Sequence, residues 1–206
     1  MTKLLSRRSI VVCGVAVSAA CGAAPQPQTE MQWEEPTLPP ELAQVRAGLD
    51  RYRDVVAAVH DRYLSTIGCI EFPLSGGEGE MQYEPGGMGV HLLNLQYISP
   101  VLDPARPQVL IYQPVGDSLR LAAAEWFVPV EAAGGQRPKI FGRDLEGPMA
   151  GHHPLMPEGL HHYDLHVWLW KNNPVGVFSP TNPMLTCPES GYTFEEAAPK
   201  LVSPGH

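Results

Sequence analysis

The chain has 206 residues, 44% of them hydrophobic, and its 22 acidic residues outnumber 14 basic ones, giving a formal net charge of -8. An acidic protein repels phosphate groups, so the composition argues against a nucleic-acid partner and against attraction to anionic lipid beyond any covalent anchor. The residues that follow an N-terminal leader suffice for one ordinary core, and we expect a single domain.

Residues 1–20 are typical of a secretory signal peptide. Lys3, Arg7 and Arg8 precede a short apolar run that ends at Ala20. This run is shorter than the roughly 20 residues that a membrane-spanning helix needs. The Arg7-Arg8 pair resembles a twin-arginine signal, which exports folded proteins, although adjacent arginines also occur in ordinary signals. We therefore predict export to the periplasm or cell envelope and leave the route open.

The sequence Ser18-Ala19-Ala20-Cys21 resembles a lipobox, in which the cysteine is lipidated and becomes the new N-terminus. We predict a lipoprotein that is anchored to a membrane through Cys21. Simple cleavage at the small residues is the alternative. The rest of the segment 21–40 is rich in proline and small polar residues, which predicts a semi-extended tether.

Cys69 and Cys187 are the cysteines that remain for a disulfide, because Cys13 lies in the leader and Cys21 would carry lipid. An oxidising compartment seldom leaves two thiols free, so we predict that they pair. Two unrelated thiols are the alternative.

The segment from Glu41 to about Ile67 predicts one long amphipathic helix, because its apolar residues recur every three or four positions. These positions are Leu42, Val45, Leu49, Tyr52, Val56, Val59, Tyr63 and Ile67. Pro39 and Pro40 precede the first turn, where proline is tolerated, and Gly68 would end the helix.

Beyond Gly76 and Gly77, short β-branched and aromatic runs alternate with glycine and proline, which predicts strands and loops. The predicted strands are 89–98, 109–113, 119–130, 139–142, 162–170 and 175–178. Without a second helix to connect parallel strands, the sheet should be mainly antiparallel. We therefore expect an α+β fold, with the long N-terminal helix packed on a sheet that can roll towards a barrel. The domain would cover 41–190, and 191–206 would form a loose tail.

Three predicted strands each place one ionisable residue on a face that is otherwise apolar or aromatic, namely His91, Glu125 and His166. The expected neighbours are Leu93, Leu95 and Tyr97 for His91, Leu121, Ala123 and Phe127 for Glu125, and Trp168 and Trp170 for His166. Two imidazoles and one carboxylate from three neighbouring strands suit a facial site for Fe, Mn, Cu or Zn, with positions left open for water or substrate. A hydrogen-bonded Glu-His pair without metal is the alternative.

Histidines are dense in a second region, where five of the eight fall between positions 152 and 166. His162 and Asp164 share the predicted face of His166, and we expect them to orient the ligands or to act as further ligands. His152 and His153 are adjacent and cannot both point to one side of a strand. His60 lies between charged neighbours on the predicted helix and should face solvent.

Several motifs resemble an uncharacterised family of exported bacterial proteins. They are the stretch 51–63, GGMGVH at 86–91, the stretch 121–128 and YDLHVWLWKNNP at 163–174. The resemblance covers nearly the whole domain, and it implies that the helix and strands form one unit with His91, Glu125 and His166 inside its motifs. It implies no activity, substrate or cofactor.

The leading functional hypothesis is an exported lipoprotein with one divalent transition-metal ion, acting as a small-molecule oxidase or hydrolase. One alternative is a non-catalytic envelope lipoprotein that binds a ligand or partner. Another is a metal-buffering protein that uses its clustered histidines. The sequence contains no nucleophile elbow, phosphate-binding loop or dinucleotide fingerprint, which argues against hydride and phosphoryl transfer.

Overall fold

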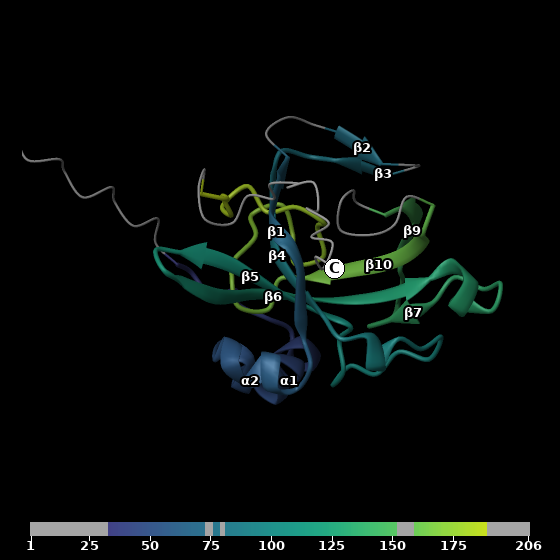
Figure 1. Cartoon of the computed structure of the whole chain (residues 1–206), viewed down its shortest axis with the longest axis horizontal. Coiled ribbons are helices and arrows are strands. Elements are labelled where there is room, and N and C mark those ends of the chain that lie inside the picture. Colours follow the sequence, from purple (N-terminus) through teal and green to yellow (C-terminus); the bar gives the residue numbers. More distant parts are fainter. Residues whose placement is uncertain (1–32, 73–75, 79–80, 152–158, 189–206) are drawn as a thin grey trace, which may run out of the picture. The chain divides into compact units, whose positions relative to one another are not determined.

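The computed structural model describes residues 33–72, 76–78, 81–151 and 159–188 (Figure 1). The predicted signal peptide, the lipidated Cys21, the tail 191–206 and the pair His152 and His153 lie outside these residues. Within the described part, no helix is both long enough and apolar enough to cross a membrane.

A six-stranded antiparallel sheet forms the frame of the domain, in the order β1-β4-β5-β6-β10-β9. Its strands are β1 (Leu64–Phe72), β4 (Gly86–Leu93), β5 (Val109–Val115), β6 (Ser118–Pro129), β10 (His161–Val167) and β9 (Glu146–Ala150). Two further antiparallel hairpins pair β2 (Gly76–Glu78) with β3 (Met81–Tyr83), and β7 (Lys139–Ile140) with β8 (Arg143–Asp144). The α+β class and the antiparallel sheet are as predicted.

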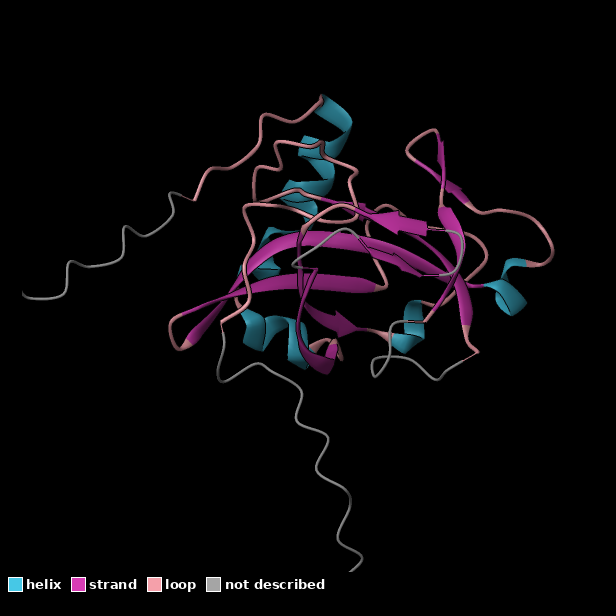
Figure 2. Cartoon of the chain, turned by 90° about the horizontal axis from the view of Figure 1, so that it is seen from above, coloured by secondary structure: helices cyan, strands magenta, loops and turns pink. Residues whose placement is uncertain are grey.

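The sheet is curved but does not close into a barrel (Figure 2). β1 and β9 are its two edges, and no ladder joins them among the described residues. The separate β2-β3 hairpin, which lies between β1 and β4 in the sequence, instead contacts β9, because the hydroxyl of Tyr83 on β3 donates to Sδ of Met149 on β9 at 3.1 Å. The expectation of a barrel is therefore corrected to an open, curved sheet.

The single helix predicted over 41–67 is wrong. The chain forms α1 (Pro40–Leu49), the 3-10 helix η1 (Asp50–Arg53) and α2 (Val55–His60), and then enters β1. Asp54 interrupts the helical path, because its backbone is extended and its carboxylate accepts a hydrogen bond from the backbone N–H of Val56. Aspartate is a favoured N-cap, so it begins a new helix at this point.

The four main strands predicted beyond residue 88 are confirmed with shifted bounds, and the short strand at 139 is confirmed over two residues. The strand predicted at 175–178 is not formed. The prediction also missed β1, whose first residues 64–67 fell inside the expected helix, and β9, which contains the Gly147-Pro148 pair. Proline cannot donate to a ladder, and a Gly-Pro pair usually indicates a turn.

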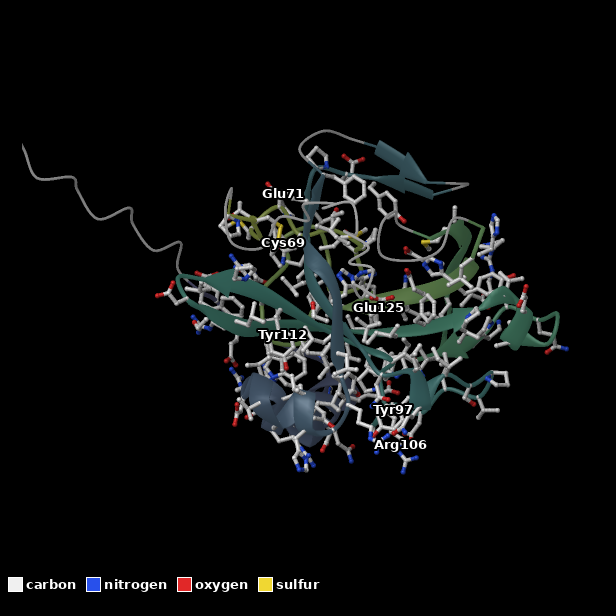
Figure 3. All side chains as sticks on the ribbon, viewed as in Figure 1. Cys69, Glu71, Tyr97, Arg106, Tyr112 and Glu125 are labelled. Atoms are coloured by element: carbon white, nitrogen blue, oxygen red, sulfur yellow. A yellow bond between two sulfur atoms is a disulfide. The ribbon has the colours of Figure 1, made fainter. Side chains whose placement is uncertain are left out.

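The two faces of the sheet have separate apolar clusters. On one face, the helices contribute Leu42, Leu49 and Tyr52 to a core that includes Leu110 and Tyr112 of β5. The hydroxyl of Tyr112 donates to the carbonyl of Tyr52 at 2.6 Å and ties β5 to η1. The opposite face contains Val109, Ile111, Phe127, Trp168 and Leu185. Figure 3 shows Tyr112 on the side of α1 and α2, and Glu125 on the side away from them.

The segment that follows β10 is bound to both β1 and β4. Cys69 of β1 forms a disulfide with Cys187, as predicted, across a sequence separation of 118 residues and a Cα–Cα distance of 5.6 Å. Gly87 and Asn182 exchange two backbone hydrogen bonds, each of 3.0 Å. A Cβ atom on Gly87 would lie 2.5 Å from the carbonyl oxygen of Leu185, so only glycine allows this close approach.

Candidate metal centre

The structure brings His91, Glu125 and His166 together on the face of the sheet opposite the helices. Glu125 and His166 are direct partners in the ladder between β6 and β10. His91 lies on β4, and β5 separates it from β6, because His91 pairs with Ile111 and Glu125 pairs with Val109. The expectation of three neighbouring strands is therefore wrong for β4. The imidazole of His91 reaches Glu125 across β5.

The distances within this triad are close to those of a common coordination sphere. His91 Nε2 is 3.4 Å and His166 Nε2 is 3.7 Å from Glu125 Oε2. One ligand atom from each of the three residues lies within 4.8 Å of the other two. Ligand atoms bound to one zinc ion at about 2.0 to 2.2 Å lie roughly 3.0 to 3.5 Å apart. The triad could therefore hold a metal after a small inward movement of its side chains.

All three residues of the triad are buried, with exposed fractions of 6% for His91 and 2% each for Glu125 and His166. Burying a carboxylate is costly unless an opposite charge compensates it. The two imidazoles supply that charge only when they are protonated, whereas a divalent cation supplies it with both imidazoles neutral. The burial of this donor set is thus compatible with either an internal ion pair or a bound metal.

Backbone and carboxylate groups orient the two imidazoles. The carbonyl of Gly89 lies 3.2 Å from Nδ1 of His91, which places a proton on Nδ1 and turns Nε2 towards Glu125. Asp164 Oδ1 lies 3.7 Å from Nδ1 of His166, on the side of the ring away from Glu125. A carboxylate behind a ligating histidine is the usual way in which proteins fix the ring of a metal ligand.

Asp164 also contacts His162, as their shared face predicts. His162 Nε2 is 3.3 Å from Asp164 Oδ2, and the ring of His162 packs on Phe127 with centroids 4.7 Å apart. His162 and Asp164 are both buried. A continuous series of buried contacts between ionisable side chains thus runs from His91 through Glu125, His166 and Asp164 to His162.

The carboxylates control the charge of His166. Burial lowers the pKa of His166, but Glu125 and Asp164 outweigh that effect and raise it to about 9. For Asp164, burial raises the pKa, yet contacts with His162 and His166 prevail and hold it below its ordinary range. These contacts favour a protonated His166 and an ionised Asp164 in the metal-free protein at neutral pH.

Glu146, which the sequence pattern did not indicate, is also part of this environment. Glu146 of β9 is the ladder partner of Asp164, and it is partly buried. Burial raises the pKa of Glu146, and the charge of Asp164 raises it further. The residue escaped notice because β9 was not predicted. The burial of Gly147 and Met149 alternates with their neighbours, but Gly-Pro obscures that alternation in the sequence.

Several expected face-sharing neighbours lie elsewhere. Leu121 belongs to the helix-side cluster, because the ladder shifts by one residue at Ala122. Leu95 is exposed, and Trp170 also packs in the helix-side cluster, whereas Trp168 packs on the side of the triad. Both tryptophans are fully buried, which supports their role in core packing.

The remaining described histidines lie at the surface. His60, at the end of α2, is exposed as predicted. His161 is exposed as well, and its Nδ1 contacts the carbonyl of Gly159 at 3.1 Å.

Comparison with known proteins identifies no similar protein. No protein-family model, no curated protein and no solved structure matches the chain. The resemblance to a family of exported bacterial proteins stays a prediction. The function must therefore be argued from the site itself.

Proposed function

We propose that this protein binds one divalent transition-metal ion through His91, Glu125 and His166 and acts on a small molecule in the periplasm or cell envelope. The observation that carries the proposal is the convergence of three buried ligand atoms from β4, β6 and β10 within 4.8 Å of one another. Two imidazole nitrogens and one carboxylate oxygen suit Fe, Mn, Cu or Zn.

Each residue of the site has a distinct role in this proposal. His91 and His166 provide the nitrogen ligands, and Glu125 supplies the charge that balances a divalent ion. Asp164 holds the ring of His166, and the Gly89 carbonyl fixes the tautomer of His91. Three protein ligands leave coordination positions for water or substrate, and a bound ion would supply Lewis acidity or redox chemistry there.

The reaction class depends on which ion is bound. Zinc would favour hydrolysis, because it has no accessible second oxidation state and activates water. Iron, manganese or copper would favour oxidation. We propose an oxidase or hydrolase on this basis.

Export and lipidation complete the proposal. The leader sequence and Cys21 support a lipid-anchored protein, and the disulfide between Cys69 and Cys187 suits an oxidising compartment. The protein would then be attached to the membrane through the lipid on Cys21 alone.

A second candidate is a non-catalytic envelope protein in which the same residues form only internal ion pairs. The elevated pKa of His166 favours this alternative, because a protonated His166 can pair with Glu125 and Asp164 without metal. It predicts a folded protein that takes up no metal.

A measurement of the bound metal distinguishes the two candidate functions. The full chain would be expressed with its leader, purified without a His tag or chelator, and analysed by plasma mass spectrometry beside a His91→Ala, His166→Ala variant. A His60→Ala, His161→Ala variant is the matched control, because both of its histidines are exposed. We expect about one equivalent of a single metal in the wild type and control and none in the site variant. A folded wild type that neither contains nor takes up metal would exclude the metal site.

A further inference from the structure

Two cations share the indole ring of Trp33, which belongs to the segment before α1. Arg120 of β6 places its Cζ atom 4.0 Å from the ring centroid, and Lys171 places its Nζ atom 4.6 Å from it. The indole N–H of Trp33 donates to the carbonyl of Trp170 at 2.9 Å, so the ring is fixed beside the segment that carries Lys171. Cation-π contacts of this kind hold the two cations in defined positions.

Lys171 is buried to an unusual degree for a lysine, with 3% of the residue exposed. Its backbone N–H donates to the carbonyl of Ala122 at 3.1 Å, which fixes it against β6. Burial, with a smaller effect of the Arg120 charge, lowers the pKa of Lys171 to about 8. The ammonium is therefore charged at neutral pH at an energetic cost, which a nearby anion would offset.

No carboxylate of the described residues forms an ion pair with Arg120 or Lys171. Five of the other described cations have acidic partners, namely Arg46, Arg51, Arg53, Arg106 and Lys139. In a chain with a net charge of -8, two cations that contact the same indole ring and have no acidic partner among the described residues form a local positive site.

A third polar group lies beside Arg120. Gln113 of β5 is the ladder partner of Arg120, so the two side chains leave the same face of the sheet. Gln113 is 8% exposed, and its Oε1 atom has no hydrogen-bond partner within the described structure. A rotation of the terminal amide would instead present two N–H donors at this position.

We propose that Gln113, Arg120 and Lys171 form a binding site for a small oxyanion, such as a carboxylate, sulfate or phosphate group. Arg120 can donate two parallel hydrogen bonds to an oxyanion, and Lys171 contributes a compact charge. Trp33 holds both cations in place through its ring. None of these residues belongs to the metal triad, so the proposal does not depend on the proposed function.

The test is a titration of the full-length protein at pH 7, followed through the Trp33 indole N–H signal in an ¹⁵N-labelled sample. Sodium sulfate, phosphate and acetate would each be added at constant ionic strength against sodium chloride, and Trp33→Phe would assign the signal. We expect a saturable shift with at least one of these oxyanions. Sulfate or phosphate would indicate a tetrahedral ligand, and acetate a carboxylate.

Arg120→Gln and Lys171→Met should each raise the dissociation constant at least about tenfold, because each removes a charged donor. Arg143→Gln is the matched control, since it removes a guanidinium that stacks on Phe178 at 4.6 Å, and it should leave binding unchanged. A linear shift that is equal in all four proteins would overturn the proposal. If Lys171→Met does not fold, the exposed Arg120→Gln decides the outcome by itself.

Discussion

Glu125 and His166 are direct cross-strand partners, and Oε2 of the carboxylate lies 3.7 Å from Nε2 of the imidazole. The ladder between β6 and β10 fixes this spacing, because neighbouring partners on both sides continue the same register. His91 instead reaches the pair from the far side of β5. The pairing of β6 with β10 thus sets the distance between Glu125 and His166. The curvature of the sheet brings His91 to this pair.

Glu125→Gln should abolish tight metal binding while it preserves the size of the side chain. The amide carries no charge to balance the ion, so we expect the dissociation constant to rise at least about a hundredfold. Competition with a chromophoric chelator measures this constant. The exposed Glu131→Gln is the control, and an unchanged affinity in Glu125→Gln would contradict the assignment of Glu125 as a ligand.

Asp164→Asn should weaken metal binding without abolishing it. Asp164 acts on the metal through the ring of His166, and the loss of such a group usually costs about 10- to 100-fold in affinity. The stoichiometry should stay near one, and the absorption spectrum of the cobalt-substituted protein should shift. A spectrum and an affinity identical to those of the wild type would show that Asp164 does not position His166.

Metal binding should release a proton at neutral pH. In the metal-free protein the pKa of His166 is raised to about 9, so the ion must displace that proton, and its apparent affinity should increase with pH up to about 9. Calorimetry in buffers of different ionisation enthalpy counts the released protons. Binding without proton release at pH 7 would mean that His166 is neutral before the metal binds.

The charge of His166 also determines how the stability of the metal-free protein varies with pH. The folded-state pKa of about 9 exceeds the ordinary value of 6.5, so this residue stabilises the fold fully below 6.5. The stabilisation should be lost as the pH rises through about 9. Urea unfolding at a series of pH values checks this trend, and His166→Gln should flatten it.

Gly87→Ala should destabilise the domain because the new methyl group would collide with the backbone of Leu185. We expect a loss of about 1 to 3 kcal/mol in the free energy of unfolding. Gly48→Ala is the matched control, because nothing lies within 4 Å of its added Cβ and it lies in α1. That change should stabilise the protein by up to about 1 kcal/mol. Equal effects of the two substitutions would contradict the close packing of the C-terminal segment on β4.

The site residues were accessible to sequence reasoning, whereas the long helix was not. Alternation along a strand depends only on local backbone geometry, so it placed His91, Glu125 and His166 on one face correctly. The apolar spacing of 41–67 fitted a helix throughout. Asp54 nevertheless caps a new helix, and Leu64 begins a strand that pairs with β4. A local pattern cannot report such pairing, because the partner strand lies far along the chain.

By itself, the sequence determined the α+β class, the disulfide between Cys69 and Cys187 and the identity of the three candidate ligands. Only the tertiary structure decided that β5 separates β4 from β6, that Glu146 lies beside Asp164, and that Trp33 joins Arg120 and Lys171. The physical reason is the range of the interactions. Side-chain alternation and cysteine chemistry follow from single residues and their neighbours, whereas strand order, register and curvature depend on the packing of the whole domain.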